Sequence, residues 1–247
     1  RLYSMIVKRF GTKALTKSLE TNNPQIQSYF VGDPGRKSDV SGMMAVEELK
    51  GFIGGEAPII YIWGPPESGK TNFALLLAQM AKEYIHDNLQ VGTNIRTLEE
   101  KDVWINTFGK LDKWISENIR DLEGGGQQMA KDSDNKLMIF DEASTDANAS
   151  GEEGWNTRKK LAPMVYKIRK AKAGLIIIGH DGKDVDPSIR TLAKCVRKYK
   201  EDKKLARIFD DVSERKGYDE YSISPIKKKK KTDWTYNDKE ASSFSWT

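Results

Sequence analysis

Residues 59–71 have the sequence Ile59-Ile60-Tyr61-Ile62-Trp63-Gly64-Pro65-Pro66-Glu67-Ser68-Gly69-Lys70-Thr71. β-Branched and aromatic residues fill the first five positions, a composition typical of a buried strand. Glycine and proline then break the run, and the apolar residues Phe73, Leu77 and Met80 follow at helical spacing. The stretch therefore predicts a strand, a tight loop and a helix in direct succession.

The loop matches the pattern G-x-x-x-x-G-K-[ST]. Its glycines permit backbone conformations that a Cβ forbids, so successive N–H groups can turn toward an anion at the start of the following helix. Lys70 adds a positive charge, and the Thr71 hydroxyl is a ligand for Mg²⁺. We expect the phosphates of ATP to contact Gly64, Pro65, Pro66, Glu67, Ser68, Gly69, Lys70, Thr71 and Asn72. The alternative, a plain strand-to-helix turn, is disfavoured by the strand before the loop and the helix after it.

A second stretch supplies carboxylates. Leu137-Met138-Ile139-Phe140-Asp141-Glu142 is an apolar strand that ends in two acids. Phosphoryl transfer requires a positioned metal and a positioned nucleophile, because positioning and charge stabilisation supply most of the catalysis. We expect Asp141 to hold Mg²⁺ and Glu142 to polarise the attacking water. This order of motifs favours an ATPase over a passive nucleotide-binding protein.

Three further residues are candidates for the same site. His180 follows the apolar strand 175–178, so in a parallel sheet it emerges at the edge that binds ligands. It is either a sensor of the γ-phosphate or a structural histidine. Arg169, near a helix end, and Arg190 are candidates for neutralising phosphoryl charge from a neighbouring subunit, and Arg169 is preferred. The alternative for both arginines is an ordinary solvated side chain.

Apolar runs and helical patterns alternate along the chain. Strands are predicted at 59–63, 89–95, 137–140 and 175–178, and helices at 41–53, 72–85, 101–122 (one or two) and 154–172, with a polar loop at 124–135. This alternation predicts an α/β fold with a mostly parallel sheet covered on both faces. An antiparallel β-hairpin is expected from 196–199 and 205–212. The run Lys227–Lys231 and an aromatic tail with Trp234, Tyr236, Phe244 and Trp246 follow.

We divide the chain into a basic N-terminal segment and linker (1–37), an ATPase core (38–200) and a C-terminal part with hairpin, lysine run and tail (201–247). The pattern over residues 1–20 predicts a basic amphipathic helix. Such a helix docks either on a membrane or on its own domain or a neighbouring subunit, and the second reading is favoured.

Composition narrows the function classes. Of the 247 residues, 38% are hydrophobic and 31% are charged, and no run approaches the roughly 18 apolar residues of a membrane span. The single cysteine excludes an internal disulfide. A net charge of +5 permits a nucleic-acid partner without requiring one.

The chain resembles the additional-strand, catalytic-glutamate P-loop NTPases, and among them the FtsK/HerA group, which includes viral genome-packaging ATPases. The runs 161–170, 178–185 and 232–236 are similar to small ATPases of haloarchaeal viruses and plasmids. Members of the wider group are typically ring-forming DNA motors with an arginine acting in trans, at the place of Arg169. Their sensor is often a glutamine, where this chain has His180. Halophile proteins are strongly acidic and this chain is basic, so we expect a different host.

The first hypothesis is an oligomeric ring, a pentamer or hexamer, that hydrolyses ATP with Mg²⁺ and translocates DNA for genome packaging or plasmid transfer. The lysine run and a basic group at 158–172 are the candidate DNA contacts. We expect it in the host cytoplasm, with a capsid or membrane-associated partner. The alternatives are a membrane-proximal assembly ATPase that moves no DNA, and a switch that binds nucleotide and rarely hydrolyses it.

Overall fold

The computed structural model describes residues 50, 52–55, 57–121, 127–129, 135–141, 163–182, 185, 187–201, 206–209, 221–223, 232–240 and 242–245. Several sequence predictions lie outside these residues: the N-terminal helix at 1–20, most of the helix at 41–53, residues 154–162, the lysine run at 227–231, Trp246 and Glu142.

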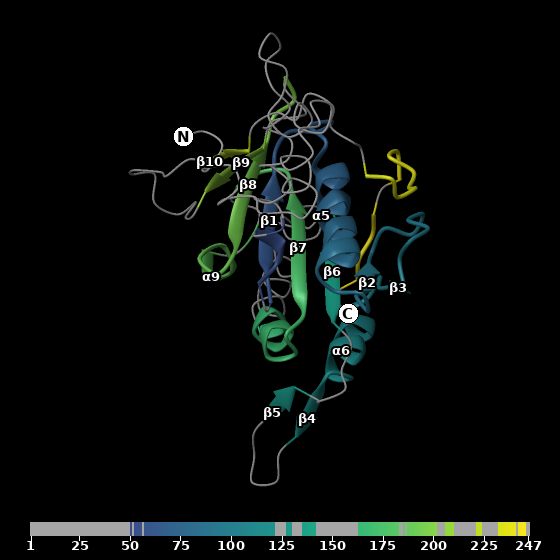
Figure 1. The fold of residues 1–247 in the computed structure, drawn as a ribbon. Coiled ribbons are helices and arrows are strands. Elements are labelled where there is room, and N and C mark those ends of the chain that lie inside the picture. The colour runs from purple at the N-terminus through teal and green to yellow at the C-terminus, as the bar shows by residue number, and fades with distance from the viewer. Residues whose placement is uncertain are drawn as a thin grey trace, which may run out of the picture.

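An eight-stranded sheet organises the described part of the chain (Figure 1). Its strands are β1 (Ile59–Trp63), β2 (Gln90–Thr93), β3 (Val103–Trp104), β6 (Lys136–Phe140), β7 (Gly174–Gly179), β8 (Lys194–Lys198), β9 (Ala206–Phe209) and β10 (Tyr221–Ile223). The order is β10-β9-β8-β1-β7-β6-β2-β3, in which the six strands from β8 to β3 are parallel and β9 and β10 are antiparallel. Strand β7 separates β1 from β6, so the predicted mostly parallel α/β sheet with an additional strand is confirmed.

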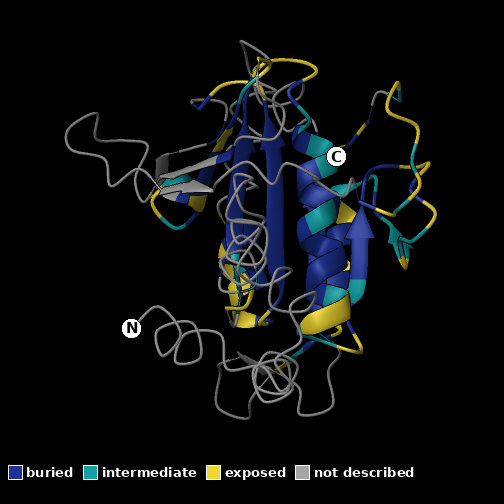
Figure 2. Cartoon of the chain, turned by 45° about the horizontal axis from the view of Figure 1, so that its top comes forward, coloured by how far each residue is buried: buried dark blue, intermediate teal, exposed yellow. Residues whose placement is uncertain are grey.

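Helices cover both faces of the parallel sheet. Helix α5 (Lys70–Tyr84) packs on one face, where Phe73 and Leu77 meet strand residues such as Ile62. Helix α6 (Phe108–Ser116) and the helix at 163–170 pack on the other, where Trp114 and Ile168 lie in the same core as the opposite side chains of the strands. Figure 2 shows the central strands in the dark blue of buried residues. Burial on both faces explains why β1, β6 and β7 are nearly continuous apolar runs.

The region predicted as one or two helices at 101–122 is only partly helical. Residues Val103–Trp104 form the edge strand β3, and Thr107 begins α6 by accepting a hydrogen bond from the Lys110 N–H (3.3 Å). Strand β4 (Ile119–Asp121) follows and pairs with β5 (Gln127–Met129), within the predicted polar loop. The helical prediction was wrong at both ends, because spacing alone did not separate core residues of a helix from those of short strands.

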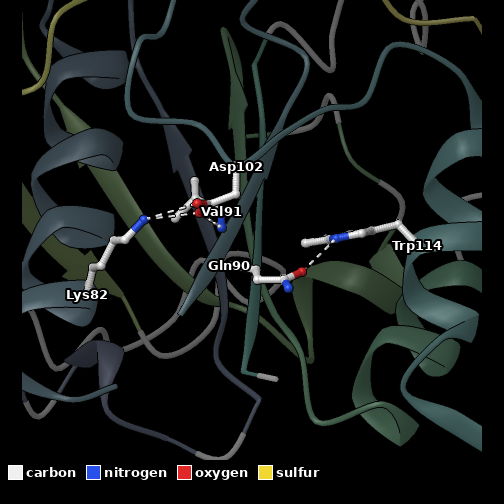
Figure 3. A network of polar contacts seen from close by, with 5 residues as sticks. All are labelled: Lys82, Gln90, Val91, Asp102 and Trp114. Atoms are coloured by element: carbon white, nitrogen blue, oxygen red, sulfur yellow. Dashed lines mark hydrogen bonds and ion pairs between the residues drawn. The ribbon is translucent and has the colours of Figure 1, made fainter. Parts of the chain in front are cut away.

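Polar contacts fix the β2–β3 edge of the sheet. The Asp102 carboxylate accepts from the Val91 N–H (2.7 Å) and from Lys82 Nζ (3.1 Å) on α5 (Figure 3). On the other face, Trp114 Nε1 donates to Gln90 Oε1 (3.3 Å). Strand β2 is therefore tied to helices on both sides of the sheet.

The predicted hairpin is present as β8 and β9, with two differences. Strand β8 also pairs in parallel with β1, so it is a strand of the core sheet as well as of the hairpin, and β10 adds a third strand.

Within the part of the chain described, no helix is long and apolar enough to cross a membrane.

We call residues 232–240 and 242–245 the C-terminal strap (yellow in Figure 1). Trp234 and Tyr236 pack against the core on the α5 face, and Phe244 is buried on the opposite face with its ring edge-on to Phe140, 4.8 Å between centroids. The tail aromatics Trp234, Tyr236 and Phe244 therefore pack within this chain.

Candidate active site

The loop between β1 and α5 is tightly constrained by its neighbours. Gly64 has φ 153°, and a Cβ there would lie 2.4 Å from the Lys198 carbonyl oxygen of β8. Gly69, the residue before α5, has φ 78°. Two positions of the loop therefore require glycine, one for backbone contact and one for a left-handed conformation.

Lys70 lies inside the loop and is 8% exposed. Its ammonium donates to the carbonyl oxygens of Gly64 (3.0 Å) and Pro65 (3.1 Å). Ser68, two positions before Lys70, is completely buried. No group of the described residues forms a hydrogen bond with its Oγ. A buried positive charge and a buried hydroxyl without a partner at a helix N-terminus fit a phosphate ligand.

The two stretches singled out in the sequence meet at the carboxyl end of the sheet. Thr71 Oγ1 lies 3.3 Å from Asp141 Oδ2 and 3.5 Å from Oδ1, although the residues are 70 positions apart. Asp141 follows β6 directly and is 8% exposed. A hydroxyl and a carboxylate at this separation are the oxygen ligands that Mg²⁺ takes beside nucleotide phosphates.

Asn94, which the sequence analysis did not select, fixes the position of Asp141. Its side chain accepts from the Asp141 N–H (2.8 Å) and donates to the Asp141 carbonyl oxygen (2.9 Å). Trp104 Nε1 in turn donates to the Asn94 carbonyl oxygen (3.4 Å). The sequence placed Asn94 inside the strand predicted at 89–95, whereas β2 ends at Thr93, and the neighbour of this strand in the sheet was not yet known.

The other predicted site residues are distributed as follows. His180 follows β7 and is exposed, and the Tyr61 hydroxyl donates to the carbonyl oxygen of the adjacent Asp181. Arg169 is exposed on the helix at 163–170. Arg190 Nη1 donates to the Gly182 carbonyl oxygen (3.0 Å), which fixes it to the loop after β7. Glu142 lies outside the described residues.

The charge of Asp141 also influences Tyr236 of the strap. Burial raises the pKa of its phenol, and the negative charges of Asp141 and Asp238 raise it further, while a hydrogen bond with the Asn72 side chain opposes the shift. The phenol therefore stays protonated well above neutral pH. The sequence showed an aromatic tail here but nothing to connect it with residues more than 90 positions away.

The chain has recognisable relatives at the level of family and fold. A model of the family "ATPase family associated with various cellular activities (AAA)" matches residues 60–202, more than half of the chain. No curated protein matches the sequence.

Three solved structures are similar to parts of this chain. The N-terminal domain of zonular occludens toxin from Neisseria meningitidis is 17% identical (TM-score 0.38, covering 67% of this chain and 93% of that one). The genome packaging NTPase B204 from Sulfolobus turreted icosahedral virus 2, in complex with AMP, is 12% identical (TM-score 0.43, 68% and 98%). The flagellar accessory protein FlaH from Methanocaldococcus jannaschii is 16% identical (TM-score 0.34, 70% and 95%).

Proposed function

The chain belongs to the AAA family of ATPases, and we propose that it hydrolyses ATP with Mg²⁺ held between Thr71 and Asp141. The contact of 3.3 Å between these two side chains carries the proposal, since they come from separate motifs and would supply two of the oxygen ligands of the metal. The buried Ser68 hydroxyl and Lys70 ammonium support a phosphate in the loop.

Each residue has a distinct task in this mechanism. When bound, Mg²⁺ neutralises charge on the phosphates of ATP. Lys70 exchanges its carbonyl partners for phosphate oxygens, and Asn94 keeps Asp141 in place through its backbone. Glu142 orients the attacking water, His180 detects the γ-phosphate, and Arg169 contacts the nucleotide of a neighbouring subunit.

We further propose that the ATPase is a ring-forming DNA motor of the FtsK/HerA type, active in genome packaging or plasmid transfer in the host cytoplasm. The runs 161–170, 178–185 and 232–236 support this through their similarity to viral and plasmid ATPases. Lys170 and Lys172 are exposed at the end of the helix at 163–170 and just after it, which supports a basic contact surface. Lys167 is excluded from it, because its ammonium pairs with Asp112 (2.6 Å).

Turnover measurements test the catalytic part. We expect Lys70→Ala to lower ATP turnover by roughly 10²- to 10³-fold, because a preorganised charge on the transferring group is lost. Glu142→Gln should lower turnover by a similar factor and preserve ATP binding. Lys82→Ala, a lysine change near the far end of the same helix, is the control and should keep wild-type turnover. Full activity in Lys70→Ala would overturn the assignment.

DNA dependence and oligomer mass test the motor. We expect double-stranded DNA to stimulate turnover, and ATP with Mg²⁺ to shift the mass from monomer to ring. A monomer without DNA stimulation would overturn the motor while leaving the ATPase intact. If the intact chain floated with liposomes under those conditions, the membrane-proximal alternative would replace it.

A further inference from the structure

A cavity of about 300 Å³ lies at the edge of the sheet opposite the loop before α5. Its walls include Pro58, just before β1, and Leu137, near the start of β6. Figure 1 shows this edge as the one from which the arrows of β1 and β7 start. Ala81, in the last turn of α5, closes another side. The cavity is thus separate from the candidate active site, which lies at the carboxyl ends of the same strands.

The inner wall of the cavity is apolar. Four buried residues of the core on the α5 face line it: Ile53, Ala81, Leu89 and Leu137. Each of them is at most 5% exposed. Ligand pockets are typically lined by apolar side chains, with a few polar groups that fix the orientation of the ligand. A space of this size against such a wall fits a short hydrocarbon chain.

Polar side chains lie at the mouth of the cavity. His86 and Asn135 are half-buried there, and Lys172 is exposed. The backbone of His86 is fixed on both sides, because its N–H donates to the Ala81 carbonyl oxygen (2.9 Å) and its carbonyl oxygen accepts from the Leu89 N–H (3.2 Å). The imidazole therefore extends from a well-defined position between the end of α5 and β2.

Lys172 occupies a backbone position where glycine is usual. The preceding helix ends in a Schellman motif, in which the Lys172 N–H donates to the Arg169 carbonyl oxygen (3.0 Å) and the Ala173 N–H to that of Ile168 (3.0 Å). Lys172 has φ 51°, and the one other non-glycine residue with positive φ among those described is Glu67, in the loop before α5. A lysine held in a left-handed conformation indicates a use for its side chain that offsets the strain.

The charges around the cavity select the kind of ligand. None of the described residues that line it is acidic. Lys136 lines it too, but its ammonium donates elsewhere, to the Trp114 carbonyl oxygen (2.6 Å) and the Glu117 carboxylate (2.9 Å). Positive charge at the mouth therefore comes from Lys172, and from His86 when it is protonated. An anionic head group is complementary to this mouth, whereas a cationic one is not.

We propose that this cavity is a second ligand site, which takes a small anion with a hydrocarbon body. The body lies against the apolar inner wall, and the anionic head lies at Lys172 and His86. The head is a carboxylate or a phosphate monoester, since both accept hydrogen bonds from an ammonium and from an imidazole N–H. The inference does not depend on the proposed function, because the cavity shares no residue with the candidate active site.

NMR titration of the ¹⁵N-labelled full chain tests the proposal. We expect octanoate or octyl phosphate to shift the amide signals of Ile53, Gly55, Leu89 and Gly174 along one saturable curve, with a Kd of about 0.1–1 mM. The comparison of these two probes identifies the head group. Acetate lacks the hydrocarbon body and octylammonium reverses the charge, so neither should saturate these signals in the same range.

Substitution of Lys172 tests the charged mouth. Lys172→Gly should weaken binding of the better octyl anion about three- to tenfold, the range of one hydrogen bond. Its melting temperature should not fall, because glycine adopts the left-handed conformation without strain. Lys172→Arg keeps the charge and should retain most of the affinity. Lys113→Ala, which removes one charge at an exposed position of α6, is the control and should bind like wild type.

The outcomes separate this inference from the proposed function. Absence of saturable shifts with both octyl anions would overturn the inference, as would equal binding of octylammonium. Lys172→Gly binding as tightly as Lys113→Ala would overturn it too. Displacement of the octyl anion by a non-hydrolysable ATP analogue with Mg²⁺ would contradict it, because the anion would then occupy the nucleotide site. If wild type binds the octyl anion but no nucleotide, the proposed function fails and this inference stands.

Discussion

The loop at residues 64–69 and the C-terminal strap both contact helix α5, but their contacts are encoded differently. The loop is a set of consecutive residues whose types follow from one requirement, the close approach of backbone to an anion. The strap is held by pairs such as Gln79 with Asp233, 154 positions apart, and Thr97 with Asn237, 140 apart. A motif of consecutive residues in one loop can be recognised in a sequence, whereas a contact between residues far apart in the chain cannot.

Gly64→Ala should produce the largest loss of stability, because it breaks the loop where the fold tolerates no side chain. The new Cβ would lie 2.4 Å from a backbone oxygen at a φ of 153°. Overpacking and strain together should lower the free energy of unfolding by about 3–5 kcal/mol. Denaturant unfolding measures it.

Gly109→Ala is the matched control, because a Cβ there meets nothing within 4 Å. Within α6 it should raise the free energy of unfolding by about 0.5–1 kcal/mol. Equal effects of the two changes would mean that the contact between the loop and β8 is absent in solution.

Phe244→Ala removes the buried ring at the end of the strap. Phe244 is 6% exposed and contacts Phe140, so truncation leaves a cavity beside the end of β6. Core phenylalanines lose about 3–5 kcal/mol on truncation, and we expect roughly 2–3 kcal/mol here because the strap end can detach and relieve the cavity. Exchange should then rise at the Ser245 amide before global unfolding. A rise confined to global unfolding would show that the strap does not open separately.

Strands buried on both faces were predictable, and charged strands were not. The apolar runs of β1, β6 and β7 leave no other interpretation. Strand β8 has the sequence KCVRK, yet its Lys198 is completely buried, with Nζ 5.3 Å from the centre of the Phe73 ring. Its parallel pairing with β1 joins distant parts of the chain, so the sequence indicated only a hairpin.

The same distinction holds inside the site. Thr71 and Asp141 were predictable because each belongs to a motif with a recognised order along the chain. Asn94 and Tyr236 were not, because an asparagine after a strand and a tyrosine in a polar tail are common residues in common places. Their contacts depend on the order of strands in the sheet and on the path of the strap, which are properties of the tertiary structure.

Asn94→Ala tests a residue that belongs neither to the loop nor to the strap, yet contacts the predicted acid Asp141. The change leaves the Asp141 N–H and carbonyl oxygen without their side-chain partner. We expect a loss of about 1–3 kcal/mol in the free energy of unfolding and weaker binding of nucleotide with Mg²⁺. The exposed Asn88→Ala is the control and should change neither. Binding equal to wild type would show that Asp141 needs no support from β2.

Glu240→Gln should have the smallest effect, and its pH dependence identifies the contact. Burial acts to raise the pKa of Glu240. The net effect is nevertheless a lowered pKa, because its carboxylate accepts hydrogen bonds from the Thr97 hydroxyl, the Thr97 N–H and the Arg96 N–H and lies near the Arg96 charge. Because the pKa is lower in the folded state, the charged carboxylate stabilises the fold, and this stabilisation is fully present at pH values above the unfolded-state pKa of 4.5. It is lost as the pH falls through the folded-state pKa. Solvent screening limits it to roughly 0.2–1 kcal/mol. Exchange at the Arg96 and Thr97 amides should therefore be faster in Glu240→Gln than in wild type at pH 6, and the difference should shrink steadily below pH 4.5. A difference that is constant with pH would mean that the Glu240 charge does not hold the strap.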